Sequence, residues 1–346
     1  MKRYIAVALA LVVILPASVH AQKPPRAKDA GEQSVDRALR FLANLQEKDG
    51  SWLSYNQKSP AVTSLCLMAF LSAGHVPGEG PYADAVEKGV RWVVKAQQPD
   101  GLFGGEGGLE MYHQGVCTLL LAEACGMTDR SLADELRPAL EKAVRLILQA
   151  QRTGAGIYRG GWRYRPDSPD ADVSVTGWQL LALRAARNVG CDVPAERIDL
   201  AVGFLLRCRD ARTSAFCYQP GTRPTLACTG TGILALELCR KDRHHAHEAL
   251  LGGGYLLKNP PRWGDEHFFY TAYYCGQAMF QLGGNYWDFY RPRLQQVLFD
   301  HQQSNGGWLG AEGVGPTYCT AMAVLALTVE YRFLPIYQRD ENPSSN

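Results

Sequence analysis

Two kinds of apolar segment alternate along the chain. In the first kind, Val35, Leu39 and Leu42 recur at helical spacing among charged residues, which predicts an amphipathic helix. The second kind, exemplified by residues 61–73, has almost no charge and many small side chains. A helix that is apolar on all sides must be buried on all sides. The chain therefore predicts an outer and an inner class of helix.

This pair of patterns recurs six times. The amphipathic helices are expected to begin near Gln33, Tyr82, Asp134, Ala195, His245 and Trp287, and the apolar helices near Pro60, Tyr112, Val173, Leu226, Phe269 and Tyr318. Alignment of the apolar helices on their polar entry superimposes Thr63, Gln114, Thr176, Thr229, Thr271 and Thr320. A period of roughly 50 residues is typical of helical-repeat proteins. Periodicity alone leaves open whether the repeats form an open solenoid or a closed ring.

The connector from each amphipathic helix to the next apolar helix carries a pattern of its own. Gln46 is followed by Gly50 and Trp52. Comparable sets are Gln97 with Phe103, Gln151 with Trp162 and Gln302 with Trp308, whereas the fourth connector has Arg209 for Gln and the fifth lacks it. Glycine ends a helix at little steric cost, and a Gln amide can pair with carbonyl groups left free there. We interpret these residues as structural and not catalytic.

The connectors resemble the QW repeats of the squalene cyclase and protein prenyltransferase superfamily. The pattern of a basic-small pair, an aromatic-aliphatic pair, Gln and Gly-x-aromatic is met by Arg37-Ala38, Phe41-Leu42, Gln46 and Gly50-Ser51-Trp52. This resemblance implies an all-α fold, a closed (α/α)6 toroid of six inner and six outer helices, over residues 33–339. Residues 331–339 also look like the end of secreted bacterial repeat proteins of this class, which have no assigned reaction.

The segment from Asp172 to Leu183 is where the resemblance implies cyclase chemistry. Squalene cyclases protonate an alkene with the second Asp of a DxDD motif. A Thr follows this motif, and we align it with Thr176. Asp172 then stands at the first Asp position, Ser174 at the position of the protonating Asp, and Val175 at the last Asp position. A serine hydroxyl is far too weak an acid for that step. A shifted register, which uses Asp170 and Asp172, supplies an acid but misplaces the Thr.

The zinc site of the prenyltransferases is also incomplete. Their Asp-x-Cys-x-x-x-Trp motif resembles Asp172 to Trp178 with Ser174 for Cys, and their later Tyr-His-Thr motif resembles residues 269–271 with Tyr270 for His. Neutral Ser and Tyr hydroxyls are poor zinc ligands. We expect neither a metal nor another cofactor.

The remaining candidates for chemistry stand at the entries of the inner helices. A closed ring brings His113, Asp172 and His267 toward one rim, where a His and a carboxylate can perform acid/base catalysis. Alternatively, Asp172 and Ser174 only cap their helix. Residues expected to line the cavity are Tyr112, Ser174, Thr176, Trp178, Tyr270 and Tyr318.

The N-terminal residues predict export. Lys2 and Arg3 precede an apolar run, and a small-residue site ends at Ala21, as in a cleaved signal peptide. The expected domains are a signal peptide (1–21), a flexible leader (22–32), one toroid (33–339) and a polar tail (340–346). We expect the mature protein to be periplasmic or extracellular and to have no membrane span.

The amino-acid composition limits the classes of molecule that the protein is expected to bind. The net charge is +2 and no basic tract occurs, so nucleic acid is excluded as a partner. Ten cysteines are compatible with disulfides in an exported protein; Cys191, Cys208 and Cys217, near loops, are the better candidates. No CxxC motif is present.

Two classes of function remain open. The first is a binding or scaffold protein that has lost the cyclase acid and the zinc ligands and takes an apolar small molecule, a glycan or another protein. The second is an exported enzyme that acts on an isoprenoid or lipid, or on a polysaccharide, with acid/base residues at the rim. The lining of the cavity discriminates between the ligands: an apolar aromatic cavity favours an isoprenoid, and exposed aromatics with paired carboxylates favour a glycan.

Overall fold

The computed structural model describes residues 27–104, 107–239 and 245–338. The predicted signal peptide (1–21), the first part of the leader and the polar tail (340–346) lie outside the described residues. The outer helices are α1 (Ala30–Asn44), α3 (Ala83–Lys95), α5 (Arg130–Ala150), α7 (Ala195–Arg207), α9 (His247–Lys258) and α11 (Gly284–Asp300). The inner helices are α2 (Pro60–Ser72), α4 (Glu110–Gly126), α6 (Val173–Asn188), α8 (Leu226–Cys239), α10 (Phe268–Leu282) and α12 (Pro316–Leu327).

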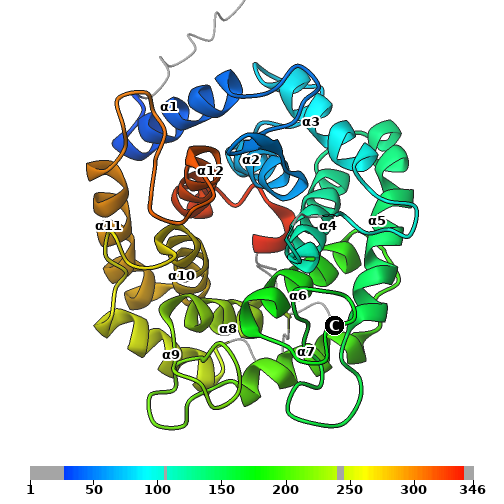
Figure 1. Ribbon diagram of the computed structural model, residues 1–346. Helices are drawn as coiled ribbons and strands as arrows, with labels where there is room; N and C mark the ends of the chain where they lie inside the picture. Colours follow the sequence, from blue (N-terminus) through cyan, green and yellow to red (C-terminus); the bar gives the residue numbers. More distant parts are fainter. Residues whose placement is uncertain (1–26, 105–106, 240–244, 339–346) are drawn as a thin grey trace, which may run out of the picture.

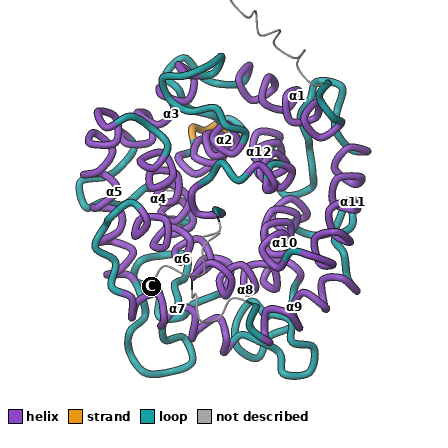
Figure 2. Tube along the Cα trace, turned by 180° about the vertical axis from the view of Figure 1, so that it is seen from behind, coloured by secondary structure: helices purple, strands orange, loops and turns teal. Residues whose placement is uncertain are grey.

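The inner helices form a closed ring (Figure 1). Each inner helix packs against the next one in the chain, and α12 returns to pack against α2. The outer helices surround this ring, and the same arrangement is visible from behind (Figure 2). The prediction of an all-α (α/α)6 toroid is therefore confirmed. In the described part of the chain, strands are limited to a short hairpin, β1 (Leu53–Ser54) with β2 (Gln57–Lys58), beside α2.

Small residues allow the inner helices to pack closely. A Cβ atom added at Gly177 of α6 would lie 2.3 Å from the methyl carbon of Thr231 on α8. One added at Gly115 of α4 would lie 2.7 Å from the Trp178 Cβ. Larger side chains at these positions would push neighbouring inner helices apart, because protein interiors are close-packed. The small residues that the sequence places in the apolar helices thus set the diameter of the ring.

The Gln-containing connectors tie neighbouring repeats together. The amide of Gln46 donates to the carbonyl of Gly50 at 3.0 Å and to that of Ala85, in α3, at 2.8 Å. Gln97, Gln151 and Gln302 make the same pair of bonds, each to its own connector glycine and to a backbone carbonyl of the next outer helix. Because the next outer helix after α11 is α1, Gln302 also closes the ring.

The Trp residues of the first, third and sixth connectors are held from two sides. The indole of Trp162 donates to the Ile147 carbonyl at 2.8 Å, and its backbone amide donates to the Thr176 hydroxyl at 3.0 Å. Trp52 pairs with Thr63 and Trp308 with Thr320 in the same way. Thr63, Thr176, Thr229 and Thr320 therefore each attach an inner helix to its connector. The interpretation of the connectors as structural agrees with these contacts.

The C-terminal segment, residues 329–338, fills one end of the ring. It includes the short helices η2 (Val329–Tyr331) and η3 (Pro335–Tyr337), shown in red inside the inner ring in Figure 1. The Tyr337 hydroxyl is hydrogen-bonded to that of Tyr273 on α10, and the Ile336 amide donates to the Glu123 carboxyl at 3.2 Å. Burial raises the pKa of Glu123 to about 8. This end of the toroid is therefore packed with protein.

No helix within residues 27–104, 107–239 and 245–338 combines the length and the apolar character needed to cross a membrane.

Candidate functional site

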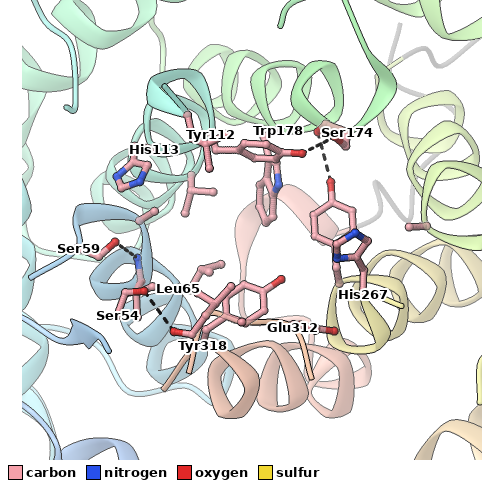
Figure 3. A pocket seen from close by; sticks show the side chains of 18 of the residues that line it. Ser54, Ser59, Leu65, Tyr112, His113, Ser174, Trp178, His267, Glu312 and Tyr318 are labelled. Carbon is pink, nitrogen blue, oxygen red and sulfur yellow. Dashed lines mark hydrogen bonds between the residues drawn. The ribbon is translucent and has the colours of Figure 1, made fainter. Parts of the chain in front are cut away.

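The other end of the ring opens into a large cavity. Its volume is about 2050 Å3, and the N-terminal ends of the inner helices supply much of its wall. Loop residues 54–59 and 312–314 form part of the rim. Figure 3 shows the side chains that project into this space. The common orientation of the inner helices thus brings residues from all six repeats to one cavity.

The aromatic part of the wall is unusual in composition. Nine aromatic side chains line the cavity: Tyr55, Trp92, Tyr112, Tyr164, Trp178, Tyr218, Tyr255, Tyr270 and Tyr318. All are Tyr or Trp, although the chain contains 11 Phe residues. Tyr and Trp combine an apolar ring with a hydrogen-bonding group. The wall therefore presents flat apolar surfaces together with polar atoms.

Hydrogen bonds fix several of these rings. The Tyr112 hydroxyl is bonded to the Ser174 hydroxyl, and the Tyr270 hydroxyl donates to the Ser174 carbonyl at 3.3 Å. Tyr112 also stacks on Tyr164, with 5.8 Å between the ring centroids. Burial is the main cause that raises the pKa of Tyr112, so its phenol stays protonated. These rings are preorganised, which reduces the entropy lost when a ligand binds.

The Tyr318 hydroxyl differs from those of the neighbouring rings. It points into the cavity (Figure 3) and has no hydrogen-bond partner among the described residues. Burial raises the pKa of Tyr318, so it is a neutral donor and acceptor. A ligand with a polar group can therefore pair with Tyr318.

Asp172 lies behind the cavity wall. Its side chain is fully buried, is absent from the lining, and accepts from the Val175 amide at 2.9 Å and the Ser174 hydroxyl at 2.8 Å. Its second oxygen faces Arg163 at 3.3 Å. Burial raises the pKa of Asp172, and the bonds from Val175 and Ser174 oppose the shift. Asp172 thus caps α6, the alternative that the sequence left open.

Thr176 is also placed outside the lining. Its hydroxyl holds the Trp162 amide and it is fully buried. The other expected wall residues, Tyr112, Ser174, Trp178, Tyr270 and Tyr318, all line the cavity. The alignment on Thr identified a position that recurs among the repeats. The role of Thr176 at this position is to attach α6 to its connector.

The structure does not bring His113 and His267 together with Asp172. The two histidines line opposite sides of the cavity (Figure 3). Burial lowers the pKa of His113, with the Glu110 carboxylate opposing the shift, and its Nδ1 atom is buried without a partner among the described residues. His267 is exposed and adopts a left-handed backbone conformation, with φ 55°, at the start of α10.

Glu312 is a wall residue that the sequence reasoning missed. Its carboxyl accepts hydrogen bonds from the Phe269 and Tyr270 amides at the N-terminus of α10, while Oε2 is buried without a partner among the described residues. Burial raises its pKa to about 7. Asp265 and Glu266 also line the cavity. The available signal was a single carboxylate in the glycine-rich connector before the last inner helix.

The wall offers no recognisable metal site. At the two positions that resemble the prenyltransferase zinc ligands, the Tyr270 hydroxyl donates to the Ser174 backbone carbonyl at 3.3 Å. Within the described ranges, no group of three His, Cys, Asp or Glu side chains is arranged to hold a metal ion. All ten cysteines are free thiols in this structure.

Residues 4–252 match the model of the prenyltransferase alpha-alpha toroid domain, which covers more than half of the chain. The protein therefore belongs to the prenyltransferase alpha-alpha toroid family. No curated protein matched the sequence.

Solved structures share the fold across several activities. The alpha-1,6-mannanase GH76A of Salegentibacter, an inactive variant in complex with alpha-1,6-mannotriose, has a TM-score of 0.65 and 10% identity, covering 87% of this chain and 100% of that one. The type II terpene cyclase MstE from Scytonema has a TM-score of 0.59 and 16% identity, covering 88% and 99%. Candida albicans protein geranylgeranyltransferase-I, complexed with GGPP, has a TM-score of 0.54 and 10% identity, covering 87% and 92%. At these identities the likeness concerns the fold alone.

Proposed function

We propose that this protein is an exported binding protein that holds an oligosaccharide in the cavity of its toroid. The observation that carries the proposal is the aromatic wall of seven Tyr and two Trp side chains without Phe. A sugar ring offers one face of C–H groups, which packs against an aromatic ring, and a rim of hydroxyl groups. Tyr and Trp match both features, because their rings are apolar and their edges form hydrogen bonds.

The polar groups of the wall support the same ligand class. Tyr318 has an unpaired hydroxyl that faces the cavity, and Glu312 has an unpaired carboxyl oxygen. Asp265 and Glu266 add further carboxylates at the rim. An isoprenoid chain cannot hydrogen-bond to any of them, and desolvating an unpaired polar group costs about 1–3 kcal/mol. A glycan satisfies these groups while it covers the rings.

The residues at the entries of the inner helices support binding without catalysis. Ser174 stands where the cyclases have their acid, and Asp172 is buried in a cap that also contacts Arg163. The toroid fold is compatible with a glycan, because the solved structure of an inactive mannanase variant with this fold is a complex with alpha-1,6-mannotriose. This neighbour supports only the compatibility of the fold, since sites and not folds determine function.

Isothermal titration calorimetry of the purified protein tests the proposal. The titrants are a panel of neutral oligosaccharides that includes alpha-1,6-mannotriose, and geranylgeranyl diphosphate as the isoprenoid. We expect saturable binding of at least one oligosaccharide and none of the diphosphate. Tyr318→Phe, which removes only a hydroxyl, should weaken that binding, whereas the control Tyr331→Phe, outside the cavity, should not.

Three results would overturn the proposal. Saturable binding of geranylgeranyl diphosphate with no response to any glycan would assign the cavity to isoprenoids. Equal affinities for wild type, Tyr318→Phe and Tyr331→Phe would place the glycan outside the cavity. Release of reducing ends from a bound oligosaccharide would instead show an enzyme.

A further inference from the structure

The fourth connector lacks the Gln that ties the first, second, third and sixth connectors to the next repeat. Arg209 occupies the Gln position and pairs with Phe216, as Gln97 pairs with Phe103 in the second connector. The Arg209 Nη1 atom is buried without a hydrogen-bond partner among the described residues. The connector therefore retains the backbone arrangement of the other copies without their side-chain tie.

Two cysteines stand at the base of this connector. The Cys217 amide donates to the Cys208 carbonyl at 2.8 Å, and the Asp210 amide donates to the Ala215 carbonyl at 2.8 Å. These two bonds flank the Arg209–Phe216 pair and bring the backbone of Cys217 against that of Cys208, the residue at which α7 ends. Residues joined by such a bond in an antiparallel pair have Cα atoms about 5.5 Å apart. Disulfides span Cα separations of about 4.4–6.8 Å.

The surroundings of the two thiols are dry. Cys208 is 1% and Cys217 is 2% exposed. Burial is the main cause that raises the pKa of Cys208, and the nearby thiols of Cys228 and Cys217 add to the shift. Since the thiolate is the form that reacts, the folded pair is inert, and a bond between them has to form while the connector is still open during folding.

We propose that Cys208 and Cys217 form a disulfide that ties the fourth connector in place of the missing Gln. The oxidant is a disulfide of a thiol–disulfide oxidoreductase or of glutathione, written RS–SR. One cysteine thiolate attacks it and releases RS⁻, and the second thiolate displaces the other RS⁻ from the mixed disulfide. The two cysteine sulfurs lose two electrons in total, the oxidant gains them, and the two protons leave with the two RSH molecules.

The bond would act on the cavity wall. Tyr218 follows Cys217, lines the cavity and accepts from the Val173 amide at 2.9 Å through its carbonyl. Its hydroxyl is bonded to that of Tyr164. A disulfide that fixes Cys217 to the end of α7 therefore fixes the position of Tyr218 as well. This inference stands on the connector geometry and does not depend on the identity of the ligand.

Peptide mapping of the full mature chain tests the disulfide. The protein is refolded in a glutathione redox buffer, alkylated, and digested without reduction by trypsin and chymotrypsin. Cleavage after Arg207, Arg209, Phe216 and Tyr218 releases Cys208-Arg209 and Cys217-Tyr218. We expect mass spectrometry to find these two dipeptides joined. Fully alkylated Cys208, or Cys208 joined to Cys228 or to any other cysteine, would overturn the assignment.

Thermal unfolding gives a second readout. We expect a reductant to lower the midpoint of unfolding of the oxidised wild type by several degrees, because the bond restricts the unfolded chain. Cys217→Ser should remove this response to reductant, while Cys239→Ser, which changes a half-buried thiol outside the connector, should keep it. A response that persists in Cys217→Ser would contradict the proposal.

Discussion

The tie between the last and first repeats allows a direct test of ring closure. Gln302 donates to the Gly306 carbonyl at 2.8 Å and to the Ser34 carbonyl at 2.9 Å. The Oε1 atom of the Gln302 side chain accepts hydrogen bonds from the Ser34 hydroxyl at 2.9 Å and from the Arg37 guanidinium. All of these groups except Gly306 belong to α1, at the opposite end of the sequence. Replacing Gln302 by Ala removes the whole set at once.

The magnitude follows from the number and burial of these bonds. Each contributes about 1 kcal/mol net, and a carbonyl left unpaired in a half-buried place adds a desolvation cost. Water reaches part of the contact between the sixth connector and α1, and it replaces some of the hydrogen bonds that the substitution removes. We therefore expect Gln302→Ala to lower the free energy of unfolding by about 3 kcal/mol, which is a large fraction of the stability of a typical domain.

Urea denaturation followed by circular dichroism measures this difference. Gln296→Ala is the matched control, because Gln296 lies on α11, shortly before Gln302, and makes one exposed bond, to Asp300 at 2.7 Å. That variant should cost no more than about 0.5 kcal/mol. Equal effects of the two substitutions would refute the conclusion that Gln302 joins the last repeat to α1.

Three further outcomes are expected. Gly160 has φ 95°, and an added Cβ would lie 1.9 Å from the Leu200 carbonyl oxygen, so Gly160→Ala should cost about 3 kcal/mol or more in urea denaturation, while Gly154→Ala, with nothing within 4 Å, should cost little. Burial raises the pKa of Glu123 from 4.5 to about 8, so the stability it contributes is complete below about 4.5 and is lost as pH rises toward 8. Urea midpoints measured from pH 5 to 8 should fall more for wild type than for Glu123→Gln, and parallel curves would contradict this. Tyr164→Ala should weaken oligosaccharide binding about tenfold in calorimetry by removing one ring of the stacked pair, and an unchanged affinity would exclude that pair from the site.

The repeat pattern made the fold predictable. Inner helices are buried on every side and outer helices on one side, so each class leaves a clear pattern of polar and apolar positions. The expected helix starts lie within a few residues of the observed ones; α1, for example, begins at Ala30 and not at Gln33. Closure could not be read from periodicity, because it depends on contacts between the ends of the sequence, such as those of Gln302 with Ser34.

The site was harder to predict because side-chain direction decides it. Ser174 and Thr176 are two residues apart on α6, yet Ser174 lines the cavity and Thr176 faces the Trp162 connector. Asp172 resembled a catalytic group in sequence and is a buried cap in the structure. Glu312 reaches the wall from the part of the sixth connector that follows Trp308, which the connector motif does not cover. Only the packing of α10 and α12 around it gives this carboxyl its place.

The packed C-terminal segment has a consequence for how the cavity can be used. Residues 329–338 occupy the end opposite the mouth, with Tyr337 bonded to Tyr273, and none of them lines the cavity. The toroid is thus a cup and not a tube. A molecule must enter and leave by one route, and a long polymer cannot be threaded through. The geometry suits a short oligomer or the terminus of a chain, so, if the ligand is the glycan proposed above, we expect the protein to bind a free chain end in preference to an internal stretch.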